Sequence, residues 1–373
     1  VVSGTVAGAG VAGVGVGLTV AVLRTVVNAI VEDSAVLDAG GDIVVDAKVG
    51  SKADVDPEDL TINNGYASKV NTSEISMDVP ADNGAEINKT AITQKESTLR
   101  LISITAGGGM AGVGVSGVIL VGSSEAVASY RGDVKKAKNL TVSTDMNYGE
   151  VLTVNTAAAA GIAGVNVAVA ATYFEGASQA AITGKAQINN VSKTIRVEST
   201  GKTNATAATG AISGGAAAVN AGVALAVNLT MVSSFIADSV TVNSPNADVY
   251  VSHKFDADGQ AYIISLGGGL VSVGVSAAVV INKLDAKSYV GRSSTIIVSK
   301  NGTLTAKSLT VTADAKGDTK VVGAGASIGG VAVNGIVAVG IGRISNVASV
   351  SGMNLTIKNA ITVTALLNGD AKV

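Results

Sequence analysis

The chain has 373 residues, of which 46 are Gly and only seven Tyr and three Phe are aromatic, while 47% are hydrophobic. Charged residues are 14%, and together with many β-branched residues this excludes a disordered chain. The net charge of −2 implies no general attraction for nucleic acid or anionic lipid. A core of Val, Ile and Ala instead of large side chains favours thin, closely spaced layers.

Cysteine is absent, which excludes disulfides, thiolate metal sites and cysteine nucleophiles but leaves the cellular compartment open. The chain starts Val1-Val2-Ser3-Gly4, without an initiator Met or a basic segment before an apolar core. We therefore expect an excised fragment whose targeting segments, if it has any, lie elsewhere.

A segment rich in small residues and valine recurs from the first residues onward, which is typical of a repeat architecture. Its anchor valines are spaced by 99, 52, 54, 54 and 60 residues, and they are Val14, Val113, Val165, Val219, Val273 and Val333. A second anchor, an apolar pair that begins with Ile43/Val45 and ends with Ile361/Val363, repeats with the same period. The unit is therefore about 54 residues long, and the first unit carries an insertion.

We divide the chain into six repeats and one insertion, all within one continuous solenoid. The expected bounds are 1–47 for repeat 1, 48–98 for the insertion, 99–150 for repeat 2, 151–202 for repeat 3, 203–256 for repeat 4, 257–316 for repeat 5 and 317–373 for repeat 6.

Within each unit, apolar residues alternate with very small ones, as Val14 and Val16 alternate with Gly13 and Gly15. A period of two predicts strands, since a helix needs a period of 3.6 and tolerates neither so much Gly nor so many β-branched residues. Gly and Ala inside a strand mark places where another backbone layer comes close. The sequence predicts an all-β fold, a right-handed parallel β-helix or β-solenoid of six ~54-residue repeats, in which one unit forms one broad coil or two or three smaller ones.

Asparagines follow the anchor valine in three repeats, as Asn166, Asn220 and Asn334. If the units stack in register, we expect these side chains to align along the stack and to share amide hydrogen bonds.

The insertion 48–98 differs in composition from the repeats, because it holds two of the three prolines and many charges. Its acidic cluster, Asp54, Asp56, Glu58 and Asp59, is a candidate for binding a partner or for weak calcium binding. Insertions in solenoids often lie on the binding face, although a tolerated surface loop without a role is an equal alternative.

Two patterns that suggest ligands or membranes have simpler explanations. The segments 8–13 and 107–112 match GxGxxG, but they recur with the repeat and precede a strand, so we expect no nucleotide and no other cofactor. The uncharged stretches 101–124, 151–174 and 203–237 alternate with period two and lack aromatic belts, so we expect no membrane-spanning segment.

Three further motifs are candidate sites. Arg131-Gly132-Asp133 is an RGD tripeptide in an expected polar turn, where host-cell attachment competes with a chance match. Asp256-Ala257-Asp258-Gly259 resembles the start of a calcium loop without its later ligands, and the default is a solvated turn. His253 is the only histidine, which excludes a multi-histidine metal site, and we expect it to be exposed near a turn at 252–258. Lys316-Gly317-Asp318 and Asn368-Gly369-Asp370 are typical of turns.

The repeats at 161–199 and 323–365 share an AGVGV-like strand, then A-x-I, then I-x-V-x-A. This pattern resembles the repeats of very large bacterial filamentous adhesins, most of all the leukotoxin-type family of fusobacteria, whose passengers are exported by type V secretion. The resemblance covers all six units and excludes the insertion. It implies an extracellular β-helical stalk at the bacterial surface that attaches to a protein or glycan receptor on host cells or other bacteria, with cytotoxicity as a further role.

We therefore expect a structural and adhesive fragment without enzymatic activity, because charges lie almost entirely in expected turns and no catalytic cluster repeats. A calcium-dependent toxin stalk and a carbohydrate-active β-helix enzyme are the alternatives. The expected partners are a surface receptor on a host cell or bacterium, and not nucleic acid.

Overall fold

The computed structural model describes residues 2–50, 99–292 and 302–373, and it is built from strands that lie in two parallel sheets. Sheet A has 13 strands and sheet B has six. The strands of sheet A are β1 (Val2–Gly8), β3 (Val36–Asp38), β4 (Ile43–Val49), β5 (Leu99–Gly108), β7 (Asp133–Ala160), β9 (Gln187–Asn189), β10 (Val191–Gly214), β12 (Thr241–Gly268), β14 (Gly302–Lys316), β15 (Thr319–Ile328), β17 (Met353–Ile357), β18 (Ile361–Asn368) and β19 (Ala371–Lys372). The strands of sheet B are β2 (Ala12–Val31), β6 (Ala111–Tyr130), β8 (Ala163–Ile182), β11 (Ala217–Ala237), β13 (Val271–Gly291) and β16 (Val331–Ser351).

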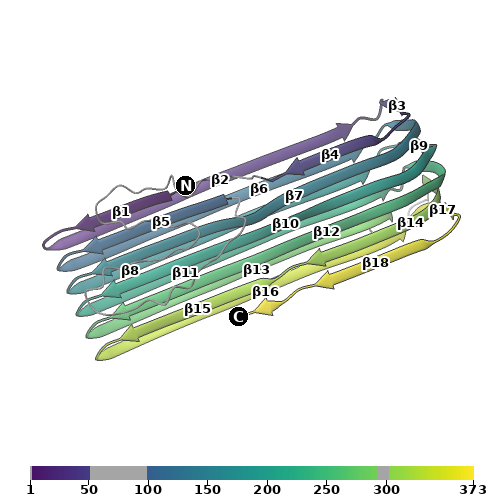
Figure 1. Ribbon diagram of the computed structural model, residues 1–373. Helices are drawn as coiled ribbons and strands as arrows, with labels where there is room; N and C mark the ends of the chain where they lie inside the picture. Colours follow the sequence, from purple (N-terminus) through teal and green to yellow (C-terminus); the bar gives the residue numbers. More distant parts are fainter. Residues whose placement is uncertain (1, 51–98, 293–301) are drawn as a thin grey trace.

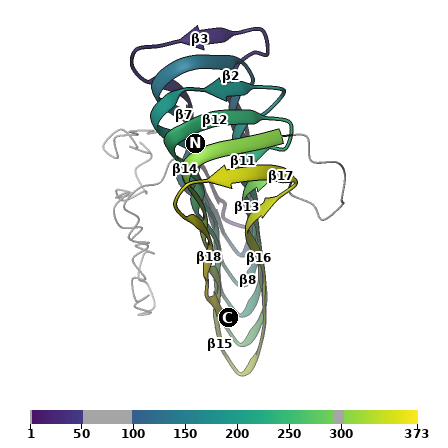
Figure 2. The same ribbon diagram turned by 90° about the vertical axis from the view of Figure 1, so that its right-hand side faces the viewer.

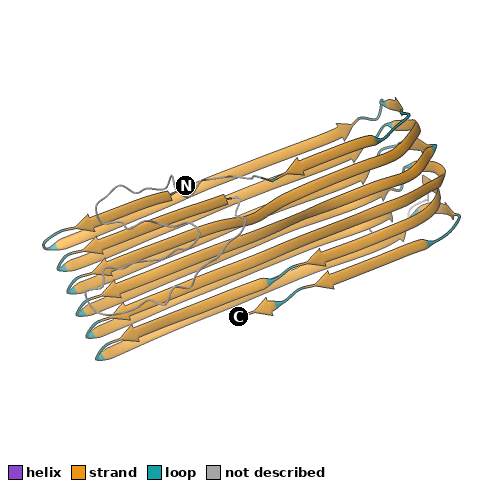
Figure 3. Cartoon of the chain, in the orientation of Figure 1, coloured by secondary structure: helices purple, strands orange, loops and turns teal. Residues whose placement is uncertain are grey.

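The fold is a parallel β-solenoid, as the sequence predicts, and each repeat forms one broad coil. A long strand of sheet A runs to a tight turn, a strand of sheet B runs back, and a wider turn leads into the next coil (Figures 1 and 3). Equivalent residues of successive repeats pair directly, as Val165 pairs with Val219 and Val219 with Val273. The period of about 54 residues is therefore the length of one turn of the solenoid.

Each coil of the solenoid is a narrow wedge, which Figure 2 shows from its broad end. The tip of the wedge is formed by the tight turns between the sheets, and the broad end is closed by short strands such as β3 and β17 that cross from sheet B to sheet A. No helix of membrane-spanning length and hydrophobicity occurs among the residues that the structure describes.

The size of the inward side chains follows the wedge. At the broad end the core is rich in Ile, Val and Leu, including Leu140 and Ile195, and it also holds Tyr130. Midway it contains further aromatic side chains, among them Tyr148 and Phe174, whose rings lie 5.1 Å apart. At the tip only Ala, Gly and small polar residues fit between the sheets, as in the cluster around Ala168.

At the tip, the face of each sheet B strand that carries Gly, Ala and other small residues points inward. The face that carries the valines points outward. A Cβ atom added at Gly114 would lie 2.6 Å from the carbonyl oxygen of Ala158 in the facing sheet, and one at Gly164 would lie 2.8 Å from that of Gly214. These distances are shorter than any real Cβ contact, so at Gly114 and Gly164 the facing backbone leaves no room for a Cβ atom. The expectation of a second backbone layer close to the glycines is confirmed.

The asparagines stack as expected but bond differently. Asn166 pairs in register with Asn220, and both are buried. Their amides donate across the interior to carbonyls of sheet A, from Asn166 to Ala157 and Ile212 and from Asn220 to Leu266. The amide groups therefore tie the two sheets together, and the expected sharing of hydrogen bonds among the asparagines is wrong.

The insertion leaves sheet A in the middle of a strand. β4 ends with Val49 opposite Met146, and β5 starts with Leu99 opposite Val151. The neighbouring β7 carries a bulge at this point, because Tyr148 pairs with Thr203 and Val151 with Ala205. Both strand ends around the insertion are thus fixed on the same neighbouring strand, and four residues of β7 lie between the two pairing positions.

Candidate functional site

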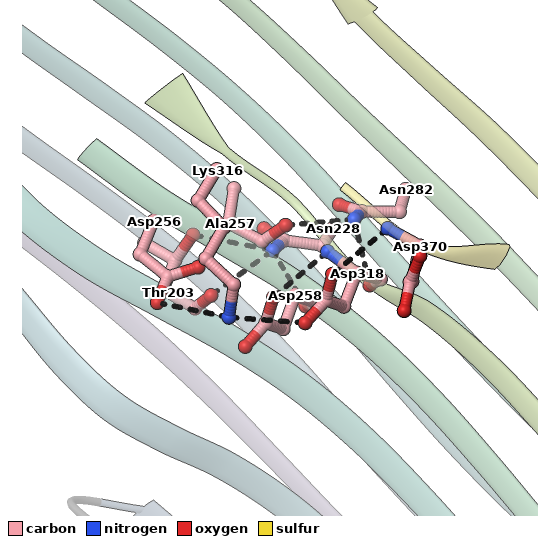
Figure 4. Close-up of polar contacts among 9 residues, drawn as sticks. All are labelled: Thr203, Asn228, Asp256, Ala257, Asp258, Asn282, Lys316, Asp318 and Asp370. Atoms are coloured by element: carbon pink, nitrogen blue, oxygen red, sulfur yellow. Dashed lines mark hydrogen bonds and ion pairs between the residues drawn. The ribbon is translucent and has the colours of Figure 1, made fainter. Parts of the chain in front are cut away.

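One acidic side chain in each of the last three coils of sheet A lies at the same height along the strands, as Asp258, Asp318 and Asp370 (Figure 4). We call these three residues the aspartate column. Asp258 lies within β12, whereas Asp318 lies between β14 and β15 and Asp370 between β18 and β19. The turn-like segments 317–318 and 369–370 are the points at which these strands are interrupted.

The aspartates stabilise the interruption. The Asp318 N–H donates to the Asp258 carboxylate at 2.9 Å, and the Asp370 N–H donates to the Asp318 carboxylate at 3.0 Å. The backbone pairing resumes on the other side, where the Gly259 N–H donates to the Asp318 carbonyl at 2.9 Å. Each carboxylate therefore replaces a backbone acceptor that the irregular strand does not provide.

Two asparagines of sheet B satisfy the carbonyl groups on the inner side of the same interruption. The Asn282 amide donates to the carbonyls of Ala257 at 2.7 Å and of Asp318 at 3.1 Å. The Asn228 amide donates to the carbonyl of Asp258 at 2.8 Å. Because a buried carbonyl without a partner is costly, these amides hold the aspartate column in place from inside.

The charges around the column are paired. The Lys316 ammonium group lies 3.0 Å from the Asp318 carboxylate and 3.9 Å from that of Asp256. Burial raises the pKa of Asp258 to about 6, and the nearby charge of Asp256 adds to this effect. Burial favours a raised pKa for Asp318 as well, but hydrogen bonds from Lys316 and from the Asp370 N–H outweigh it and lower the pKa.

A shallow pocket on the outer surface adjoins the column. It is lined by Asp258, Gln260, Asp318, Thr319, Lys320, Asp370 and Lys372. Across the described residues, no group of three or more His, Asp or Glu side chains is placed to hold a metal ion. The aspartate column has a structural role, since the carboxylates of Asp258 and Asp318 already accept hydrogen bonds from backbone N–H groups of the next coil.

The segment 252–258 is strand and not the expected turn. His253 is 1% exposed, so the expectation of an exposed side chain is wrong. Its Nδ1 lies 2.8 Å from the Ser288 hydroxyl and its Nε2 lies 2.7 Å from the Asn346 side-chain oxygen. Alternation was the signal for this placement, because Lys254 and Asp256 point outward while His253 and Phe255 point inward.

The RGD tripeptide lies in the broad-end turn between β6 and β7, where the sequence predicts a turn. Arg131 is 3.6 Å from Glu32 in the preceding coil, and its side chain is 41% exposed. The Asp133 carboxylate accepts a hydrogen bond of 2.9 Å from the Gln187 N–H of the following coil. A Cβ at Gly132 would collide with the carbonyl of Ala35, so all three residues take part in coil stacking.

The other candidate binding residues, Asp54, Asp56, Glu58 and Asp59, lie outside the described residues. The described structure thus brings together Asp258, which the sequence suggested as part of a calcium loop or a solvated turn, with Asp318 and Asp370, which it suggested as turn residues. These aspartates are spaced by 60 and 52 residues. The last three apolar anchor pairs, Val249/Val251, Leu309/Val311 and Ile361/Val363, have the same spacing, and this was the available signal.

Comparisons of the chain with protein-family models, with curated proteins and with solved structures find no match.

Proposed function

We propose that the chain is a rigid stalk segment of an extracellular bacterial filamentous adhesin, which spaces and presents contacts to host cells or other bacteria. The observation that carries the proposal is the regular stacking of sheet B. Its six strands are 20 or 21 residues long and pair without a single register shift.

Such stacking suits a stalk because every coil contacts only its neighbours, and the structure extends by about 4.8 Å per coil. The inter-sheet bonds add stiffness, as in the pairs Thr144 with Ser178 and Thr153 with Thr172, each at 2.8 Å. The resemblance of the repeats to filamentous adhesins supports the same function, and so does the placing of the RGD turn at the broad end. Weak contacts repeated along such a stalk would multiply in avidity.

Binding of the fluorescently labelled chain to cultured epithelial cells and to bacterial cells tests the adhesive role. Saturable binding is the expected result, and the absence of binding by the folded chain above an unrelated β-solenoid of equal size would overturn it. Two variants then locate the contact. One replaces residues 50–98 with a short linker, and the other is Asp133→Asn, which keeps an acceptor for the Gln187 N–H but removes the charge.

Unchanged binding after the replacement excludes the insertion as the contact, and unchanged binding by D133N excludes the RGD turn. Loss of binding in one variant, with an unaltered circular dichroism spectrum, assigns the contact to that segment.

A further inference from the structure

The outer face of sheet B is apolar from the tip to about halfway along its strands. Every outward-facing position from Ala12 to Val22, and the positions paired with them in the other five strands, carries Val, Ile, Leu, Ala, Gly or Tyr. We call this surface the valine face. The valine face ends at the next outward position of each strand, where most residues are polar or charged. These residues are Arg24, Ser123, Glu175, Leu229, Lys283 and Arg343.

The valine face is open in the interior coils as well as at the ends of the stack. Val219 is 42% exposed, Val223 40% and Val275 59%. Near the tip, the inward face of the same strands carries mostly Gly and Ala, with some polar residues such as Asn220 and Ser272. A large exposed apolar patch is a mark of an interaction site.

The outer surface of sheet A exposes apolar residues only in part. Val322 is 40% exposed, whereas Leu152 and Val154, which also point away from sheet B, are 2% and 7% exposed.

The size of the valine face fits a stable dimer. Six strands about 4.8 Å apart and eleven residues at about 3.3 Å each give a surface of roughly 1,000 Å². Two such faces together would bury about 2,000 Å², above the roughly 1,600 Å² of a standard protein interface. The largest apolar patch of an ordinary monomer is only about 300–600 Å².

We propose that the valine face binds the valine face of a second copy of this chain, by packing of sheet on sheet. Because the parallel strands pair without register shifts, the outward Val, Ile, Leu and Ala side chains form regular rows. Two sheets with such surfaces pack face to face about 10 Å apart. The face holds no charge that a polar partner would have to match, and the charges that bound it, such as Lys283 and Glu175, remain at the rim. This inference is independent of the proposed stalk function.

A lipid surface fits the valine face less well. The backbone edges of β2 and β16 lie at the two ends of sheet B, and unpaired edges are not tolerated in the hydrocarbon of a membrane. Tyr173 is the only aromatic residue on the valine face, so an aromatic belt at its rim is missing.

Sedimentation velocity of the full chain between about 1 and 100 µM tests the proposal. The expected result is a dimer. The double variant V223K/V275K should raise the dissociation constant at least about 100-fold, because it places lysines in the centre of the interface. Val275→Thr, which keeps the shape and suits a strand, should raise it by roughly tenfold.

Met231→Lys is the matched control, because Met231 lies on the same face of β11, is 54% exposed, and stands beyond the rim. Its dimer should dissociate like that of the parent. A parent chain that stays monomeric would overturn the proposal, and flotation of that monomer with phosphatidylcholine vesicles would assign the face to lipid. An open series of oligomers that V223K/V275K leaves unchanged would also overturn it, since pairing of the edges of β2 and β16 does not involve this face.

Discussion

At the scale of single residues, individual glycines at the tip of the wedge differ in how much room they have. Gly114 lies where the backbones of the two sheets approach closely, and its hydrogen atoms face the carbonyl of Ala158. Gly335, at the edge of sheet B, has no atom within 4 Å of the place where a Cβ would be. A side chain is therefore excluded at Gly114 but has free space at Gly335, although both glycines lie in sheet B strands of the same kind.

We expect Gly114→Ala to destabilise the fold by about 1–3 kcal/mol, because the added methyl group has to push the two sheets apart. Gly335→Ala should be neutral or stabilise by up to about 1 kcal/mol, since Gly in a strand has a higher entropic cost than Ala. Urea unfolding followed by circular dichroism measures both. Equal effects of the two substitutions would contradict the close approach of the sheets.

The hydrogen-bond partners of His253 define which ring nitrogen carries the proton when the imidazole is neutral. The Asn346 side-chain oxygen is an acceptor and fixes the proton on Nε2, while Nδ1 accepts from the Ser288 hydroxyl. Burial lowers the pKa of His253 below its ordinary value of 6.5, although the bond to Asn346 and the charge of Asp314 oppose this. The unfolded chain therefore binds this proton more readily than the folded chain.

The folded state should lose stability as the pH falls through about 6.5 towards the lowered pKa of His253, and the contribution is fully present at higher pH. Removal of the titrating group in His253→Gln should make the loss between pH 8 and pH 5 smaller than in the parent. Urea unfolding at each pH measures the difference between the two chains, so that effects of Asp258, whose raised pKa acts in the opposite direction, cancel. Parallel pH profiles would contradict a buried neutral histidine.

At the scale of elements, alternation and repeat spacing were enough to predict the strands and their stacking. They did not reveal the wedge, because the sequence pattern gives the size of inward residues such as Ala168 and Tyr148 but not the distance between the sheets. Nor did they reveal that Asp318 and Asp370 interrupt strands, since Gly-Asp pairs are also common in ordinary turns. His253 was misplaced because its charged neighbours suggested a turn, although they alternate with buried residues.

Removal of the insertion tests whether β4 and β5 are two parts of one strand of the stack. On the other side of β7, the strand β10 passes the same level without an insertion. Its residues Lys202-Thr203-Asn204 lie there between Gly201, which pairs with Met146, and Ala205, which pairs with Val151. Replacing residues 50–98 with Lys-Thr-Asn should therefore join β4 and β5 into one continuous strand. We expect the fold to be retained and its thermal midpoint to be unchanged or raised, because a loop closure is removed. Loss of the β-sheet circular dichroism signal would show that residues 50–98 are required for the stack.

At the scale of the whole molecule, one repeat makes one broad coil, so that residues one repeat apart are direct neighbours. This geometry accounts for the composition as well, because a thin wedge needs many glycines and few aromatic residues. It also underlies the proposed stalk, in which length grows only by stacking further coils.

Cysteine pairs test this claim most directly, because the chain contains no cysteine of its own. Glu198 pairs with Ser252, and Ser252 with Thr312, all on the outer face of sheet A. Neighbouring strands are about 4.8 Å apart, within the Cα separation of about 4.4–6.8 Å that a disulfide allows. The account predicts that E198C/S252C forms an intramolecular disulfide on mild oxidation and that E198C/T312C, two coils apart, does not. Failure of the first pair, or equal cross-linking of both, would contradict it.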